Sequence, residues 1–245
     1  MSETIKTSVP LPPLDHIARP SVADQVFDAL HARILSLELP PRTKMSEADV
    51  AKQMGASRQP VRDAFSRLSK LGFLTIRPQR ATTVSLISGA DVMRAKFIRT
   101  ALESETCRTA CLVRTDDDLA DLATLIAQQK LAIDANDRQM FHSLDDQFHQ
   151  KICTQSGVVF AWEMIHESKA HMDRVRFLTL DSTSQKLAYQ EHIAILDAIA
   201  ARDGDAAAYC MREHLSRIRT LVGTLKDGTT TGLPKATSNA DRGNR

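Results

Sequence analysis

The sequence predicts a mainly α-helical protein with an N-terminal winged helix-turn-helix followed by an all-α antiparallel six-helix bundle. Two observations support this order. Residues 46–83 have the pattern of helix, turn, helix and two-stranded ribbon, whereas no strand pattern follows residue 89 for over 130 residues. A chain of 245 residues is long enough for two modest domains, each with its own core.

Four segments follow from composition and periodicity. Residues 1–20 contain four prolines and are predicted to form a flexible arm. Residues 21–88 make up the predicted winged helix-turn-helix, and residues 89–226 make up the predicted helical domain. Residues 227–245 are polar and lack periodicity, so we expect a disordered tail.

The second helix of the helix-turn-helix has two distinct faces. Ser57 is a suitable N-cap and Pro60 falls in the first turn, where its missing N–H costs nothing. Arg58 and Arg62 lie one turn apart near this end, where arginines suit phosphates and guanine edges. An ordinary solvated helix face is the alternative. The apolar residues recur with helical spacing and are expected in the core: Val61, Ala64, Phe65, Leu68 and Leu71.

Charge is distributed unevenly along the chain. Residues 42–80 carry nine Lys/Arg against three acids, whereas residues 89–245 carry twenty Lys/Arg against 22 Asp/Glu. A basic first domain suits an anionic partner such as nucleic acid, and the near-neutral second domain suits a different task.

Residues 22–88 resemble the DNA-binding domain of GntR-type bacterial transcription regulators. The resemblance rests on the first helix VADQVFDALHARILSLELPP, on Glu47–Ala51, on the SRQPVRDAFSRL core and on residues 71–80. It implies that Arg58 and Arg62 face double-stranded DNA and that the wing around Gln79 and Arg80 reaches a minor groove. Ala48 and Ala81 depart from the family pattern, in which many members carry an arginine and a glycine at these two positions. The expected DNA-binding residues are Arg58, Gln59, Arg62, Arg67, Arg77, Gln79 and Arg80.

The second domain reads as helices near residues 90–113, 116–134, 137–155, 158–180, 183–201 and 205–224. Breaks at Thr115, Asn136, Ser156–Gly157, Asp181–Ser182 and Asp203–Gly204 separate them. No apolar run approaches 18 residues and the four cysteines have no CxxC spacing. We therefore expect a cytoplasmic protein without a membrane partner, with cysteines that act as small core residues.

Three histidines and one aspartate of this domain lie on or beside apolar helix faces. Asp145 and His149 are four residues apart on the third of these helices, His192 lies on the fifth, and His214 on the sixth. One divalent metal would satisfy all four, since imidazole and carboxylate suit Zn²⁺, Ni²⁺ or Mn²⁺. Core histidines with ordinary hydrogen bonds remain the alternative, and His142 is a rival ligand because it precedes His149 by seven residues.

The segments LDDQFHQKI, EHIAILDAIAARDGDAAA and REHLSRI are similar to the FCD effector domain of the FadR branch. The six predicted helices favour its VanR-like subgroup. The resemblance implies a metal at Asp145, His149, His192 and His214, with Zn²⁺ preferred over Ni²⁺ or Mn²⁺ and with positions open to an organic acid.

The resemblance also extends to an R-x-x-x-E element. Arg99 and Glu103 match it and are candidates for effector binding, with a surface ion pair as the alternative. Arg174 and Arg176 are further candidates.

These observations favour a metabolite-responsive transcription regulator, a repressor that acts as a homodimer on a palindromic operator and releases it when a small organic acid binds. In this interpretation, residues 89–226 bind the metal and the effector and form the dimer, and the chain is not an enzyme. The alternatives are a metal-dependent hydrolase and a sensor of the metal ion itself.

Overall fold

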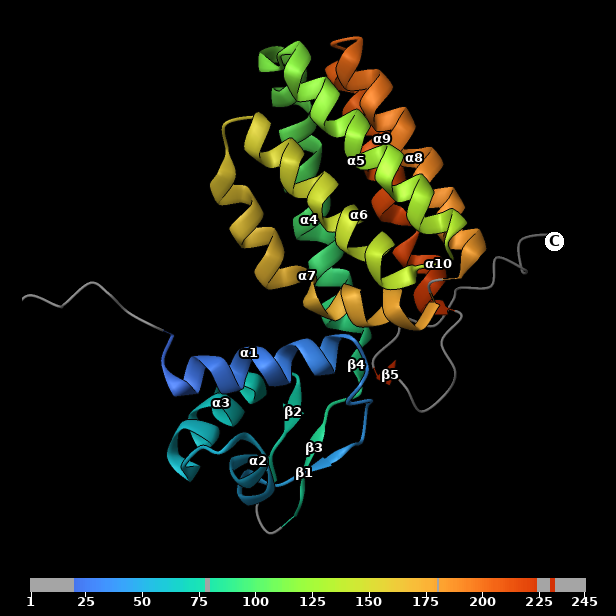
Figure 1. Cartoon of the computed structure of the whole chain (residues 1–245). Coiled ribbons are helices and arrows are strands. Elements are labelled where there is room, and N and C mark those ends of the chain that lie inside the picture. Colours follow the sequence, from blue (N-terminus) through green and yellow to red (C-terminus); the bar gives the residue numbers. More distant parts are fainter. Residues whose placement is uncertain (1–19, 78–79, 180, 224–229, 232–245) are drawn as a thin grey trace, which may run out of the picture.

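The computed structural model describes residues 20–77, 80–179, 181–223 and 230–231 (Figure 1). The predicted flexible arm lies outside these residues, apart from Pro20. The predicted tail also lies outside them, apart from Thr230–Thr231, which form a short strand instead of the expected disorder. Within the described residues, no helix combines the length and the apolar character needed to cross a bilayer.

The N-terminal domain is a winged helix-turn-helix, as predicted. Its three strands form an antiparallel sheet in the order β1-β3-β2, with Lys44 opposite Thr83 and Leu74 opposite Val84. The elements are α1 (Val22–Leu35), β1 (Lys44–Met45), α2 (Glu47–Met54), α3 (Arg58–Lys70), β2 (Leu74–Thr75) and β3 (Thr82–Val84).

Local signals in the sequence set the helix ends of this domain. Ser21 and Asp24 form a capping box at the start of α1, and Gly55 ends α2 with a φ of 62°, a left-handed conformation that glycine adopts without strain. Ser57 precedes α3, but its side chain makes no capping hydrogen bond. Leu71 is 47% exposed because it follows the last turn of α3, so its predicted place in the core was wrong.

The second domain is a bundle of antiparallel helices (Figure 1). Its last predicted helix is interrupted at Arg217 and gives two helices, of which α10 is the shorter. A short parallel pairing joins β4 and β5. The elements are β4 (Ile87–Ser88), α4 (Gly89–Val113), α5 (Asp116–Asp134), α6 (Arg138–Gln155), α7 (Val159–Thr179), α8 (Ser182–Ala200), α9 (Gly204–Ser216), α10 (Ile218–Gly223) and β5 (Thr230–Thr231).

Helix α7 joins the two domains, since its C-terminal half passes over α1 (Figure 1). Ala170 packs in the apolar core of the winged domain. Nε2 of His171 lies 2.9 Å from the carbonyl oxygen of Leu71, and its ring stacks on Phe73 with centroids 4.5 Å apart. The two domains therefore contact each other through specific packing as well as through the short linker.

Candidate metal centre and nucleic-acid interface

Four side chains from three helices converge inside the second domain. Asp145 and His149 lie on α6, His192 on α8 and His214 on α9, and one donor atom from each lies within 4.8 Å of the others. Asp145 and His192 are completely buried, and His149 and His214 are almost so. The structure thus brings together the four residues that were expected to hold a metal.

Each imidazole ring is oriented by an acceptor oxygen near Nδ1. These acceptors are Gln129 Oε1 for His192 (2.8 Å), Glu191 Oε2 for His214 (2.7 Å) and Glu103 Oε2 for His149 (2.6 Å). The Gln129 amide is fixed in turn, because its Nε2 donates to the carbonyl of Leu144 at 3.2 Å. Since the oxygens of Gln129 and Glu191 only accept in these hydrogen bonds, Nδ1 carries the proton in His192 and in His214, and Nε2 keeps its lone pair, the tautomer that a metal requires.

The charge at the centre suits a cation. Burial would raise the pKa of Asp145, but Arg176 and the nearby histidines outweigh it and hold that pKa well below its usual range. Burial also lowers the pKa values of His192 and His214 well below the usual histidine value. At neutral pH the centre therefore presents the Asp145 carboxylate and the neutral imidazoles of His192 and His214, which are donors for a divalent ion.

Arg176 is the cation nearest to this centre in the structure. Its Nη2 lies 2.5 Å from Oδ1 of Asp145, whereas Nε2 of His192 lies 3.6 Å from the same oxygen. A buried carboxylate without a counter-charge is costly, so Arg176 stabilises Asp145.

Arg99 and Glu103 form a buried ion pair behind the centre. Nε of Arg99 lies 2.5 Å from Oε1 of Glu103, and both residues are 1% exposed, so the surface ion pair considered from the sequence is wrong. Burial would raise the pKa of Glu103, but Arg99 and then His149 hold it below its usual range. Glu103 thus connects Arg99 to His149, one of the four converging residues.

A small cavity adjoins His214, one of the four residues. Its volume is about 30 Å³, enough for one or two water molecules. Arg99, Arg176 and Arg217 line it together with His214, so guanidinium groups surround it. Of these arginines, the sequence singled out Arg99 and Arg176.

His142, the rival ligand, lies in a separate cluster. Its Nε2 is 4.0 Å from Oδ1 of Asp173, and its ring packs on Phe177. Nζ of the buried Lys169 lies 2.5 Å from Asp173 and 2.7 Å from Asp146. This cluster offers one imidazole where the first offers three, and Lys169 pairs with both of its carboxylates, so it is the weaker metal candidate.

Sequence reasoning missed two of the three residues that orient the histidines, Gln129 and Glu191, and it singled out Glu103 for effector binding instead. Gln129 lies on α5 and carries no sequence signal, because only packing brings it to His192. Glu191 directly precedes His192 in the sequence, yet it contacts His214 instead. The glutamate beside a candidate histidine was the one available signal.

Helix α3 presents the predicted DNA-contacting residues on an exposed face. Arg58, Gln59 and Arg62 are all exposed, and Nε of Arg62 lies 3.4 Å from Oε2 of Glu47 on α2. Arg77 and Arg80 are exposed in the loop between β2 and β3, whereas Gln79 lies outside the described residues.

Arg67 makes contacts that the sequence did not predict. Its Nη1 donates to Oδ1 of Asp24 at 2.7 Å, and its guanidinium lies 4.1 Å from the centre of the Phe27 ring. These contacts hold the side chain against α1 and favour a structural role, while its contact with DNA stays a prediction.

Comparison with known proteins identifies both domains. Residues 22–84 match the model of bacterial regulatory proteins of the gntR family, and residues 96–217 match the FCD domain. The chain is 36% identical to YdfH, an HTH-type transcriptional regulator of Escherichia coli O6:H1, over 84% of this chain and 91% of that protein. It is 35% identical to the HTH-type transcriptional repressor RspR of Escherichia coli K12, over 84% and 90% of the two chains.

Solved structures agree on the fold. Escherichia coli McbR/YncC superposes with a TM-score of 0.69 at 23% identity and covers 84% of this chain and 99% of its own. A GntR transcriptional regulator from Rhodococcus sp. RHA1 gives a TM-score of 0.68 at 20% identity over 84% and 100% of the two chains. The chain therefore belongs to the GntR family of bacterial transcription regulators, with a gntR DNA-binding domain joined to an FCD domain, and it is a DNA-binding regulator rather than an enzyme.

Proposed function

We propose that this regulator is a homodimeric repressor that leaves a palindromic operator when a small organic acid binds beside a divalent metal. The observation that carries the proposal is the orientation of three imidazoles by acceptors at Nδ1, which leaves every Nε2 for one shared ion. A group of ordinary core histidines would instead use both ring nitrogens in hydrogen bonds. Nε2 of His192 and both ring nitrogens of His149 lack a hydrogen-bond partner among the described residues, and Nδ1 of His149 lies 2.6 Å from Oε2 of Glu103 as an ion-pair contact.

Asp145, His149, His192 and His214 would hold the metal, with Zn²⁺ preferred over Ni²⁺ or Mn²⁺. When bound, the ion would supply a Lewis-acidic position for an effector oxygen. Glu103, Gln129 and Glu191 keep the rings in the required tautomer and orientation.

An anionic effector fits the charge of the cavity beside His214. Arg99, Arg176 and Arg217 line that cavity, and arginines bind carboxylates in a bidentate geometry. Its volume of about 30 Å³ is too small for an organic acid. An acid must therefore displace part of the wall, which includes Met172 and Arg176 of α7.

The same helix offers a route from the effector to DNA. Arg176 of α7 contacts Asp145, whereas Ala170 and His171 contact the winged domain. A movement of α7 that admits the acid would change how the winged domain is held. An effector can release DNA only if it binds the two conformations unequally, and a preference of about 1–3 kcal/mol would change operator occupancy roughly 5–150-fold.

We infer a homodimer from the way in which helix-turn-helix proteins bind palindromic operators. One helix-turn-helix contacts one half-site, and a twofold protein matches a palindrome. Sedimentation of the protein with and without operator DNA should give a dimer, and a monomer that binds a single half-site with full affinity would contradict this part of the proposal.

The small cavity also favours a second candidate, a sensor in which the metal itself is the signal. DNA binding should be measured with metal-free protein, with Zn²⁺ alone, and with Zn²⁺ plus small carboxylic acids. We expect release only with both metal and acid. Release by Zn²⁺ alone would support the metal sensor, and release by an acid without metal would contradict the proposed centre.

His171→Ala tests the route through α7. The variant loses the stacking on Phe73 and the contact with Leu71, but it keeps the four proposed ligands. We expect unchanged metal binding and a weaker effect of the acid on DNA affinity. An undiminished effect would rule out this contact as part of the route.

A further inference from the structure

The winged domain carries a basic groove that extends beyond the predicted DNA contacts Arg77 and Arg80. The groove, here called the wing groove, has a volume of about 750 Å³ and includes Arg42, Lys44, Arg77, Arg80, Ser85 and Ser88. Leu74 and Val84 belong to the domain core, so the adjacent Thr75 and Thr83, which also line the groove, face the opposite side of the sheet. The groove therefore follows the outer face of the sheet from the wing to the interdomain joint.

The charges of the wing groove lack counter-charges. No acidic residue lines it within the described part of the chain, and Arg42, Lys44, Arg77 and Arg80 form no ion pair there. Like charges gathered in one concave surface repel one another and attract an anion from solution. Threonine and serine hydroxyls between them provide hydrogen-bond donors for the oxygens of that anion.

The backbone at Arg42 is a second observation. Its φ is 73°, in the left-handed region that favours glycine. The turn is closed by a hydrogen bond from the amide of Thr43 to the carbonyl of Pro40 at 3.1 Å. An arginine at a position that suits glycine retains backbone strain, and such strain is found at functional sites.

A third observation lies behind the wall of the groove. Nη2 of Arg174 on α7 donates to the carbonyl of Ser85 at 2.8 Å, while its Nε and Nη1 have no partner in the described residues. Arg174 is fully buried, and burial lowers its pKa to about 10, so it remains a cation at neutral pH. This uncompensated charge adds to the positive potential of the groove.

We propose that the wing groove binds backbone phosphates of operator DNA beyond the base pairs that α3 contacts. The proposal rests on DNA binding by this family and adds a second contact surface. Arg77 and Arg80 connect the predicted DNA contacts with the wing groove, because they belong to the wing contacts and also line the groove. A wing in a minor groove has a phosphate strand on each side, and the outer sheet face meets the strand farther from α3.

A duplex-length series tests this proposal. Affinity and its salt dependence should be measured on a minimal operator and on operators with longer flanks, for wild type and for Arg42→Gly/Lys44→Ala. We expect flanks to strengthen wild-type binding and the double variant to lose this gain. The slope of log affinity against log salt should fall by about 2 on long duplexes, because each lost phosphate contact contributes about one unit.

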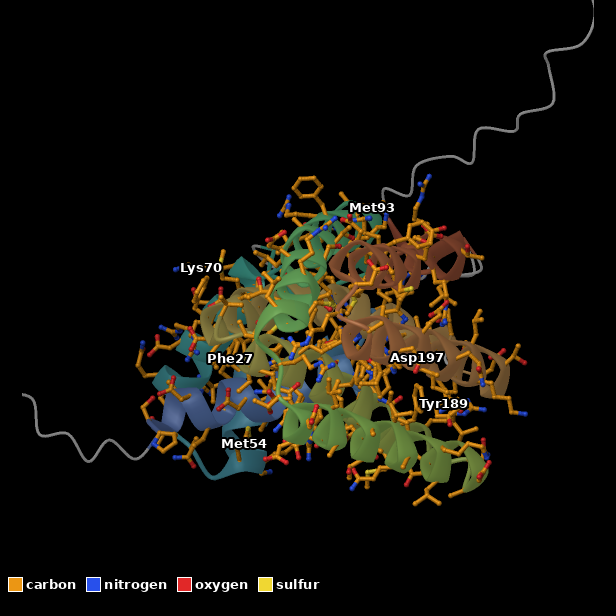
Figure 2. All side chains as sticks on the ribbon, turned by 90° about the horizontal axis from the view of Figure 1, so that it is seen from above. Phe27, Met54, Lys70, Met93, Tyr189 and Asp197 are labelled. Carbon is orange, nitrogen blue, oxygen red and sulfur yellow. The ribbon has the colours of Figure 1, made fainter. Side chains whose placement is uncertain are left out.

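The controls separate the groove from the rest of the interface. Glycine suits the backbone at position 42, so the variant should unfold at the same temperature as wild type or higher. Lys70→Ala removes an exposed cation at the edge of the molecule (Figure 2), outside the groove, and should keep the flank effect.

Two outcomes would overturn the proposal. One is a wild type that binds short and long duplexes equally. The other is binding of inorganic pyrophosphate in the groove without any effect of flanks, which would assign the groove to a small anion. In either case, normal binding of the minimal operator would leave the regulator function standing.

Discussion

The two domains place their charged side chains in opposite environments. Among the described residues, those of the winged domain that are buried are apolar, and its arginines and lysines lie at the surface. The FCD domain instead buries charged groups from several helices: Arg99, Glu103, Asp145, Lys169, Asp173, Arg174 and Arg176. A surface charge attracts DNA over a distance, whereas a buried charge is retained only where a partner or a ligand stabilises it.

This contrast predicts which property of each domain, stability or binding, a charge-removing mutation will change. A surface cation can be removed from the winged domain with little loss of stability, so changes there should affect DNA binding. Removal of one buried charge from the FCD domain leaves its partner without compensation, so changes there should affect folding as well as ligand binding.

The largest expected effect is at Arg99. Arg99→Met leaves Glu103 buried beside His149 without its main counter-charge, and the free energy of unfolding should fall by about 3–5 kcal/mol. Lys130–Asp134 is a matched control, because it has the same i,i+4 spacing but lies at the surface. Lys130→Ala should cost about 0–1 kcal/mol.

Urea denaturation, followed through the unfolding transition of the FCD domain, measures the free energy of unfolding of both variants. The double variant Arg99→Met/Glu103→Leu should recover part of the loss, since no charge of the pair is then left alone. Equal small losses in Arg99→Met and Lys130→Ala would remove the contrast between the two domains.

A smaller effect is expected at Arg62. Arg62→Ala should weaken operator binding by about 1–3 kcal/mol and relax the preference at one base step. Its unfolding should match that of wild type, because its contact with Glu47 is exposed. DNA selected by the wild-type protein from a random library serves as the operator, and fluorescence anisotropy measures affinity.

Arg67→Ala, on the same helix, is the control for Arg62. Its side chain is held by Asp24 and Phe27, so it should keep the base preference. A relaxed preference in Arg67→Ala, with none in Arg62→Ala, would reverse the assigned faces of α3.

The smallest effect concerns pH and His31. Burial lowers the pKa of His31 to about 4 from an ordinary value of 6.5. Between these values the unfolded chain binds a proton that the folded chain does not, so stability contributed by neutral His31 is present above pH 6.5 and is lost as pH falls toward 4. His31→Phe, which suits the neighbouring Phe27 and Phe73 rings, should reduce this pH dependence in urea midpoints measured from pH 4 to 7. An unchanged slope would place the titrating group elsewhere.

Local patterns predicted most of the fold. Breaks such as Thr115 predicted the helix ends of the second domain, and the apolar spacing of Val61, Phe65 and Leu68 predicted the buried face of α3. The interruption at Arg217 was not predicted, because the apolar pattern continues through it. The strand at Thr230–Thr231 was not predicted either, since it depends on pairing with Ile87–Ser88.

The candidate site was predictable only where residues share a face. Asp145 and His149 are linked by helical spacing, His192 and His214 were candidates because they lie on apolar helix faces, and the resemblance to a known family favoured all four as ligands. The hydrogen bond between Gln129 and His192 and the ion pair between Arg176 and Asp145 depend on packing between helices, which short-range sequence patterns do not predict. For the same reason the sequence left Arg67 on the DNA side, whereas the structure pairs it with Asp24.

The central claim is that four residues hold one divalent ion, and elemental analysis after gel filtration tests it most directly. Wild-type protein loaded with Zn²⁺, Ni²⁺ or Mn²⁺ should retain about one ion per chain. The control variant His142→Ala should retain the same amount. The variant His192→Ala/His214→Ala should retain none, while its winged domain stays folded. Full metal occupancy in the His192→Ala/His214→Ala protein, or no retained metal in wild type, would contradict the claim.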